Sequence, residues 1–311
     1  KFLKKNKIDH VVFDGCSNSF FSSLKLIIKG KSYSAMNLVF NNVSMQYVIL
    51  KNMIFYFKLS LGITIQKLFI KKHKQSNHNI DNLFLTRYPL HLNNNFYEDK
   101  YGDFVNKSDT YLVNLFTDGL HQDLSIRNYY KFSKLLSMSK RVEVLDNYLE
   151  YKDIFKSFFY SIFLIIKYRV FIKDQFQLNE IDLTENVMNE LNFSLIRVPR
   201  LLVWEGPIKK FIQNHEISKF HYYLHEYSYG RFFTFMFDSF SKQTHKIGFQ
   251  HGPSSMRKMV YMTAKKELQL KGDGIYSFPT PDEVLSEDVF SKEIYIHSGY
   301  SNVKIMDKVY R

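Results

Sequence analysis

The chain has 311 residues, of which 45% are hydrophobic and 23% are charged, and its formal net charge is +13. This composition excludes a disordered protein, and the length suffices for two domains or one large α/β unit. The single cysteine, Cys16, excludes an internal disulfide and a cysteine-based zinc site, and it fits a reducing cytoplasm.

Short apolar runs alternate with longer helical patterns along the chain, which predicts an α/β fold. The predicted strands are residues 11–13, 83–85, 111–116, 142–145, 201–204 and 246–249. The predicted helices are residues 20–29, 47–70, 124–137, 151–173 and 232–240. Strands separated by helices indicate a Rossmann-like parallel sheet with helices on both faces.

The last part of the chain differs in organisation from the rest. It reads as a strand at 275–278, a helix at 287–297 and a strand at 303–306. We therefore expect a Rossmann-like N-terminal domain at 1–272 and the start of a second, truncated Rossmann-like domain at 273–311.

The positive charge favours an anionic partner, which could be nucleic acid, a membrane surface or a phosphorylated substrate. No nucleic-acid-binding module is recognisable, so nucleic acid is the weakest of these. Residues 47–70 are interrupted by Lys51, Lys58 and Lys67, and the apolar run 158–166 is half of the ~20 residues that a membrane span requires. We expect neither to span a bilayer. Residues 47–70 could lie on an anionic membrane, although a buried amphipathic helix is the favoured interpretation.

In open parallel sheets, ligands bind beyond the carboxyl ends of the strands. Four predicted strands are followed by a polar residue and a glycine: Asp14-Gly15, Asp118-Gly119, Glu205-Gly206 and Gln250-His251-Gly252. The two Asp-Gly pairs are typical of ordinary turns, and for them we favour that interpretation.

The first cluster beyond these strands is Trp204-Glu205-Gly206-Pro207. Glu205 could act as a general base on an acceptor hydroxyl, beside a tryptophan ring able to stack on a sugar. Equally, Glu205 could be a helix-terminal charge that the helix dipole stabilises.

The second cluster is His225-Glu226-Tyr227-Ser228-Tyr229-Gly230-Arg231, ahead of an apolar helix. A cation in a first helical turn is unfavourable, which suggests that Arg231 pairs with Glu205, Glu226 or a phosphate. His225 and Glu226 could equally form a structural pair.

The third cluster is Gly248-Phe249-Gln250-His251-Gly252-Pro253-Ser254-Ser255. Backbone N–H groups and two hydroxyls at a helix start predict an anion site that includes Gln250, Gly252, Ser254 and Ser255. His251 could stabilise or protonate a phosphate leaving group.

These motifs resemble those of bacterial surface-carbohydrate glycosyltransferases of the capsule Kdo-transferase and O-antigen type. The resemblance rests on the segments Leu85-Thr86-Arg87-Tyr88, Trp204-Glu205-Gly206, Gly248-Phe249-Gln250-His251-Gly252, Pro281-Asp282 and Ser298-Gly299-Tyr300, and it covers about residues 83–311.

The resemblance implies the N-terminal half of a GT-B architecture and a nucleotide-sugar donor used as substrate, with no cofactor and no catalytic metal. The sequence contains no Asp-x-Asp pair. The acceptor would be a surface glycan or glycolipid, Glu205, Glu226 and His251 would be catalytic, and the enzyme would be cytoplasmic and peripheral to the inner membrane. Alternatives are a non-catalytic basic module that binds anionic glycan or membrane, and a phosphotransferase that acts on glycerol-phosphate polymers.

Overall fold

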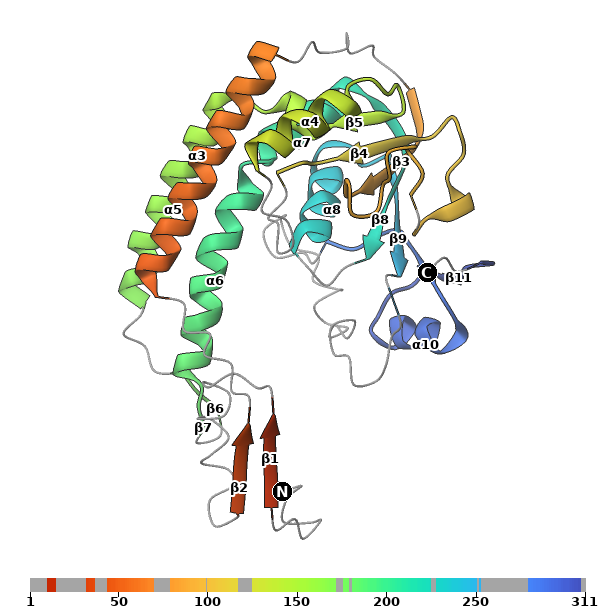
Figure 1. The fold of residues 1–311 in the computed structure, drawn as a ribbon. Helices are drawn as coiled ribbons and strands as arrows, with labels where there is room; N and C mark the ends of the chain where they lie inside the picture. The colour runs from red at the N-terminus through yellow and green to blue at the C-terminus, as the bar shows by residue number, and fades with distance from the viewer. Residues whose placement is uncertain are drawn as a thin grey trace. The chain divides into compact units, whose positions relative to one another are not determined.

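The computed structural model (Figure 1) divides the chain into two units. It describes residues 10–14, 32–36, 44–69, 79–98, 100–116, 125–171, 176–178, 181–224, 228–250, 252 and 279–308. The helical unit comprises residues 1–57 and 156–200, and the sheet unit comprises residues 58–155 and 201–311. The division falls within three helices, which are α3 (Met45–Phe69), α5 (Tyr151–Phe171) and α6 (Thr184–Leu202).

The sheet unit is built on a seven-stranded parallel sheet with the order β11-β10-β9-β8-β3-β4-β5. Its strands are β3 (Asn79–Thr86), β4 (Thr110–Val113), β5 (Val142–Val144), β8 (Glu216–Leu224), β9 (His245–Gln250), β10 (Glu283–Ser286) and β11 (Val303–Ile305). The chain starts at the middle of the sheet, moves outward to β5, and then returns to the middle to build the other half. The predicted α/β, Rossmann-like sheet flanked by helices is therefore confirmed.

Helices lie in several of the connections between these strands, whereas the described part of the connection from β3 to β4 contains only a 3₁₀ turn. The helices are α4 (Ile126–Leu136), α7 (Glu205–Asn214), α8 (Ser228–Phe240) and α10 (Val289–His297), with 3₁₀ turns η1 (Gly102–Phe104) and η2 (Leu145–Tyr148). Crossovers between parallel strands are right-handed, so a helix in the outward half covers one face and helices in the returning half cover the other. Accordingly α4 lies on one face, whereas α8 and α10 lie on the opposite face.

Strand β8 lies at the centre of the sheet and is buried from Phe220 to its end at Leu224. The Phe220 ring is fully buried and stacks on Phe237 of α8, with ring centroids 4.3 Å apart. A central parallel strand is covered on both faces, so its side chains need not alternate between apolar and polar. This strand forms the core of the sheet unit.

Two predictions need correction. The segment 201–204 was predicted to be a strand, and this is wrong, because Leu201 and Leu202 end α6 and Val203 and Trp204 form a turn before α7. Strand β8 was not predicted from the sequence. Residues 283–305, expected within a second domain, add β10 and β11 to the same sheet as β9. The predicted helix at 20–29 and strand at 275–278 lie outside the described residues.

In the helical unit, α6 contains Pro199 in its interior, where a helix normally cannot accept proline. Proline has no N–H to donate, which leaves the carbonyl oxygen of Leu195, four residues earlier, without its usual donor. Asn52 of α3 supplies one, because its Nδ2 lies 3.0 Å from that oxygen. The same Nδ2 lies 3.0 Å from Ser161 Oγ of α5, so one amide joins three helices.

Two short sheets complete the helical unit. Strands β1 (His10–Asp14) and β2 (Ser32–Met36) are parallel, and β6 (Gln177–Leu178) and β7 (Ile181–Asp182) are antiparallel. The strand expected at residues 11–13 is thus confirmed as β1, but it pairs with β2 and not with the seven-stranded sheet.

Candidate functional site

The strand order distinguishes one position in the sheet, the boundary between β3 and β8. Between β3 and β8 the direction of winding reverses, since the chain leaves β3 towards β4 and returns through β8 towards β9. At such a reversal the connections after the two strands run to opposite faces, and ligands of doubly wound proteins bind beyond the carboxyl ends there. The candidate site therefore lies beyond Thr86 and Leu224, the last residues of β3 and β8.

Two arginines belong to this edge. Arg87 directly follows β3, and its Cζ lies 5.9 Å from the ring centroid of Tyr229, the second residue of α8. Arg231 lies in the first turn of the same helix, as predicted, and is half-buried. The end of β3 and the start of α8 thus meet where the winding reverses. A helix start carries partial positive charge, so the edge favours an anion.

Buried polar atoms accompany these charges. Thr86 is the last residue of β3, and Asn114 directly follows the neighbouring strand β4. The two lie at the same edge, because Thr86 pairs in register with Val113, the residue before Asn114. Both side chains are at least 97% buried. Within the described ranges, neither Thr86 Oγ1 nor the two polar atoms of Asn114 has a hydrogen-bond partner. Buried polar groups of this kind are usually satisfied by protein groups or by ordered water.

The predicted anion-binding residues Gln250 and Gly252 are placed together at the end of β9, but protein groups occupy them. Gln250 donates through Nε2 to Gly252 O at 2.9 Å and to Ser291 Oγ at 3.1 Å, and its Oε1 accepts from Glu287 N at 2.9 Å. Gly252 N donates to Glu287 Oε1 at 3.2 Å. Gly252 has φ +81, a left-handed conformation that glycine adopts without strain. A phosphate at this N–H would have to displace the Glu287 carboxylate.

The expected role of the Trp204 ring is wrong. The side chain is 1% exposed, so it cannot stack on a sugar at the surface. Glu205 lies in the first turn of α7, which follows a helix and not a strand. Glu205 is therefore not at a strand end, and the alternative of a helix-terminal charge fits its position.

The glycine that follows Glu205 is required by a close approach. A Cβ atom at Gly206 would overlap Asp153 Oδ1, in the first turn of α5. Asp153 Oδ2 also accepts from Glu150 N at 3.0 Å, which caps α5. The start of α7 is therefore packed against another helix start, and a carboxylate fills the space that a larger residue would need.

Four other predicted residues lie outside the part of the chain that the structure describes. They are Glu226, His251, Ser254 and Ser255. In the sequence, Glu226 comes two residues after the end of β8, and His251 comes directly after β9.

A carboxylate that the sequence did not single out is buried near the end of β8. Glu98 is fully buried and accepts from Tyr101 N at 2.5 Å and from the hydroxyl of Tyr223, the penultimate residue of β8. Burial raises the pKa of Tyr223 well above its ordinary value, and the neighbouring Tyr101 and Glu98 raise it further. Tyr223 therefore remains a protonated donor, and these contacts assign Glu98 to packing of the 87–109 loop.

A second buried carboxyl follows β5. Asp146 is 1% exposed, and its Oδ2 accepts from Leu115 N at 2.9 Å. Burial raises its pKa to about 7, although backbone hydrogen bonds from Leu115 and Phe116 act in the opposite direction. Within the described residues its Oδ1 has no hydrogen-bond partner. Asp146 thus adds a titratable group to the half of the carboxyl edge that holds Asn114.

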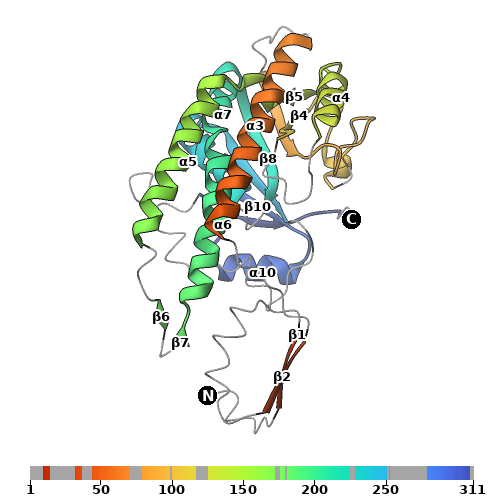
Figure 2. The ribbon, with the colours of Figure 1, turned by 60° about the vertical axis from the view of Figure 1, so that its left-hand side comes forward.

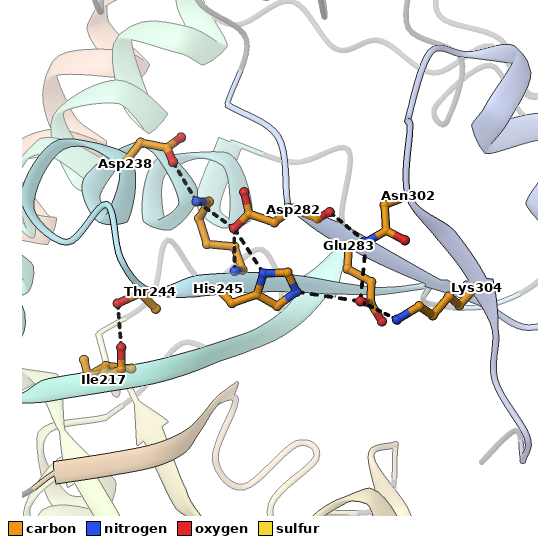
Figure 3. A network of polar contacts seen from close by, with 9 residues as sticks. Ile217, Asp238, Thr244, His245, Asp282, Glu283, Asn302 and Lys304 are labelled. Carbon is orange, nitrogen blue, oxygen red and sulfur yellow. Dashed lines mark hydrogen bonds and ion pairs between the residues drawn. The ribbon is translucent and has the colours of Figure 1, made fainter.

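The amino edge of the sheet is built differently (Figure 3). At the start of β9, Lys246 Nζ lies 2.9 Å from Asp238 Oδ1 and 2.9 Å from Asp282 Oδ2. At the start of β10, Glu283 Oε2 lies 2.8 Å from Lys304 Nζ and 3.7 Å from His245 Nε2. These groups neutralise one another, which is typical of a structural network.

Among the described residues there is no group of three or more His, Cys, Asp or Glu side chains that could hold a metal ion. Comparisons of the chain with protein-family models, with curated proteins and with solved structures find no match. The assignment of the site therefore rests on the strand order and on the residues at the carboxyl edge.

Proposed function

We propose that the protein transfers a sugar from a nucleotide-activated donor to a surface glycan or glycolipid. The observation that carries the proposal is the reversal of winding between β3 and β8, with Arg87 beside the start of α8. Doubly wound sheets bind nucleotides at such reversals. The sequence resemblance to capsule and O-antigen glycosyltransferases supplies the substrate class.

The donor phosphates would bind between the ends of β3 and β8. A guanidinium makes planar, bidentate contacts with phosphate oxygens, and both Arg87 and Arg231 lie at this edge. The first-turn N–H groups of α8 favour negative charge.

In the transfer step, the acceptor hydroxyl would lose its proton to a carboxylate as its oxygen bonds to the sugar C1. The bond between C1 and the donor phosphate would break, and the nucleotide would leave with the electron pair. Glu226 is the preferred base, because it follows β8 in the sequence, whereas Glu205 follows a helix. His251, directly after β9, would stabilise or protonate the leaving phosphate.

Donor binding tests the first part of the proposal. We expect CMP-, UDP- or GDP-sugars to raise the melting temperature, and one of them to bind measurably by calorimetry. Arg87→Gln should weaken that binding about 10- to 100-fold, because a charge-assisted hydrogen bond contributes ~1.5–3 kcal/mol. Lys242→Gln, which removes an exposed cation beyond the end of α8 at the amino edge, is the control and should bind normally. Equal affinity in wild type and Arg87→Gln would place the donor elsewhere.

Turnover tests the second part. Glu226→Gln should lower the rate of nucleotide release ~10²- to 10⁴-fold while donor affinity stays near that of wild type, since a general base contributes about that factor. Glu205→Gln should remain active. Near-normal turnover in both variants would remove the carboxylate mechanism, even if the donor binds as expected.

A second candidate is a non-catalytic basic module that binds an anionic glycan or membrane. It is favoured by the exposed apolar and basic surface of the helical unit, described below. Absence of nucleotide release with any donor, together with binding to anionic vesicles or glycans, would select this candidate.

A further inference from the structure

Helix α3 carries apolar side chains on its exposed side as well as on its buried side. Leu50, Ile54 and Phe57 are spaced i, i+4 and i+7, so they share one face, and Phe57 is 70% exposed. Met53 lies beside them and is 59% exposed. A helix that borders water normally has charged and polar residues on that side, so this face is built for a different environment.

Helix α5 repeats the pattern. Phe159, Phe163 and Ile166 also have i, i+4 and i+7 spacing, and each is more than half exposed. Lysines 156 and 167 are exposed on the same helix, and Lys51 of α3 lies 5.3 Å from the ring centroid of Tyr47. The exposed apolar residues of α3 and α5 in the helical unit are called the outer apolar face. They are Tyr47, Ile49, Leu50, Met53, Ile54 and Phe57 of α3, and Phe159, Tyr160, Ile162, Phe163 and Ile166 of α5.

The two helices form one support for this face. They run antiparallel, because Asn52 contacts Ser161 and Tyr56 contacts Ser157, with Tyr56 OH 2.8 Å from Ser157 Oγ. Figures 1 and 2 show α3 and α5 side by side from two directions. Ser157 Oγ also donates to Pro199 O at 2.7 Å, which fixes α6 to the same pair.

Among the described residues, α3 is the one helix whose length and composition would allow it to cross a membrane. Its contacts oppose a crossing. Asn52 and Tyr56 hydrogen-bond to neighbouring helices, and near its end Gln66 hydrogen-bonds to Asn147 and accepts from Tyr129 OH at 3.2 Å. A span by α3 alone would break these bonds and expose their polar atoms to hydrocarbon, at several kcal/mol each. The outer apolar face is thus suited to lie in the interface between a membrane and water.

We propose that the outer apolar face docks the protein on an anionic lipid bilayer, with α3 and α5 in the plane of the interface. Exposed phenylalanine and aliphatic side chains with lysines beside them are the pattern of interfacial helices. Lysine attracts the anionic headgroups while the rings enter the boundary between headgroups and acyl chains. The net charge of +13 has the sign that this surface requires. This proposal is independent of the proposed sugar transfer.

Vesicle sedimentation of the full chain tests the apolar part. Phosphatidylcholine vesicles that contain phosphatidylglycerol should bind the wild type. Phe159→Ser with Phe163→Ser should weaken binding about 10- to 100-fold, because two aromatic rings leave the interface. Leu50→Ser with Phe57→Ser is the equivalent change on α3, and covers the case in which one pair folds poorly. Circular dichroism checks the fold.

The matched control changes two apolar residues of similar exposure in the sheet unit. Val289 and Phe290 of α10 are 60% and 48% exposed. Val289→Ser with Phe290→Ser should bind vesicles as the wild type does. If the control loses binding to the same extent, or if folded α3 and α5 variants keep it, the proposal is overturned.

Charge is tested separately. Lys51→Gln, Lys156→Gln and Lys167→Gln together should weaken binding about fivefold per lysine at low salt, and added salt should abolish the difference. Lys107, Lys140 and Lys242 are exposed lysines of the sheet unit, and their triple glutamine variant has the same net charge. Equal binding to pure phosphatidylcholine vesicles would overturn the anionic class of lipid.

A second copy of the chain is the main competing occupant of this face. Light scattering at the same protein concentration decides between them. A wild-type dimer that the α3 or α5 substitutions convert to a monomer, with no vesicle binding, would overturn the proposal. A monomer that binds vesicles supports it.

Discussion

The two edges of the seven-stranded sheet hold most of their polar groups differently, although His215 Nε2 at the amino edge also has no hydrogen-bond partner in the described ranges. At the amino edge, Lys246 and Glu283 are each held by two oppositely charged or histidine side chains. At the carboxyl edge, Thr86, Asn114 and Asp146 bury polar atoms that have no partner in the described ranges. Both edges belong to one sheet and share its packing, so the fold alone does not require the difference.

The contrast separates polar groups that are paired within the fold from buried polar groups that have no partner among the described residues. An unsatisfied buried polar atom costs about 1–3 kcal/mol, and a structural network avoids that cost. Beyond the ends of the strands, such atoms would bond to an ordered water or to a ligand. The following predictions test whether the amino edge is structural and the carboxyl edge is not.

The largest loss of stability is expected from Lys246→Met at the amino edge. The lysine side chain is 5% exposed and bridges Asp238 and Asp282. Burial lowers its pKa, but the two carboxylates outweigh burial and raise it, so it is charged in the folded protein. The variant should lose ~2–3 kcal/mol of unfolding free energy, because the two carboxylates are left without their cation although they remain partly hydrated. Urea denaturation measures this loss.

The control for that change is Lys304→Met, which removes the exposed partner of Glu283. Because this lysine is mostly hydrated, the loss should be ~0–1 kcal/mol. Equal losses in the two variants would mean that burial does not distinguish these ion pairs.

At the carboxyl edge, Asp146→Asn should change how stability depends on pH. The folded-state pKa of Asp146 is raised to about 7, from an ordinary 3.8, by burial. The folded protein therefore holds this proton more tightly than the unfolded chain, and stability is lost as pH rises between these values. Asparagine removes that loss, so the variant should be more stable than wild type by ~2–4 kcal/mol at about pH 8, and similar to it at about pH 4.

The difference between variant and wild type must be measured, since His221 acts in the other direction. Burial, followed by Lys219 and His245, lowers the pKa of His221 to about 3. The unfolded chain then binds the proton more tightly, so stability falls as pH decreases from about 6.5 towards 3. A wild-type curve alone would mix the two groups, whereas the difference isolates Asp146. A flat difference would contradict the prediction.

The smallest but most direct test makes the same substitution at both edges. Thr244 of the amino edge donates to Ile217 O at 2.7 Å, and its Oγ1 also lies 2.8 Å from Ser241 Oγ. Thr244→Val should cost about 1–2 kcal/mol in thermal unfolding. Thr86→Val removes a hydroxyl that has no partner in the described residues, so it should cost nothing or stabilise slightly. A loss at Thr86 equal to that at Thr244 would make both edges structural.

Much of the sheet followed from local patterns, because strands such as β4 and β9 are short apolar runs bounded by polar residues. Strand β8 did not, since its buried residues 220–224 read Phe-His-Tyr-Tyr-Leu and show no alternation. Only its central place between β3 and β9 explains why polar-tipped side chains are buried there. The false strand at 201–204 has a similar origin, because the apolar run after Pro199 looks like a strand until Asn52 is known to complete the helix.

The candidate site divides in the same way. Gln250 and Gly252 were found because they follow a predicted strand end, and Arg231 because it is a cation in the first turn of a predicted helix. Asn114 follows a strand end too, but the predicted strand ran to Phe116, two residues past it. Arg87 gained its role only from its contact with Tyr229, and no local pattern marks Glu98, whose partners are Tyr101 and Tyr223.

The bond between Asn52 and the Leu195 carbonyl also has an evolutionary consequence. Pro199 and Asn52 are 147 positions apart, yet they depend on each other. The proline leaves the Leu195 carbonyl without a backbone donor, and the Asn52 amide donates to it. In relatives of this protein the two positions should change together. A chain with alanine at the proline position can form the ordinary helix bond, so it is free to replace the asparagine with an apolar residue. Co-variation of this pair would identify descendants of the same helix packing even where little else of the sequence is retained.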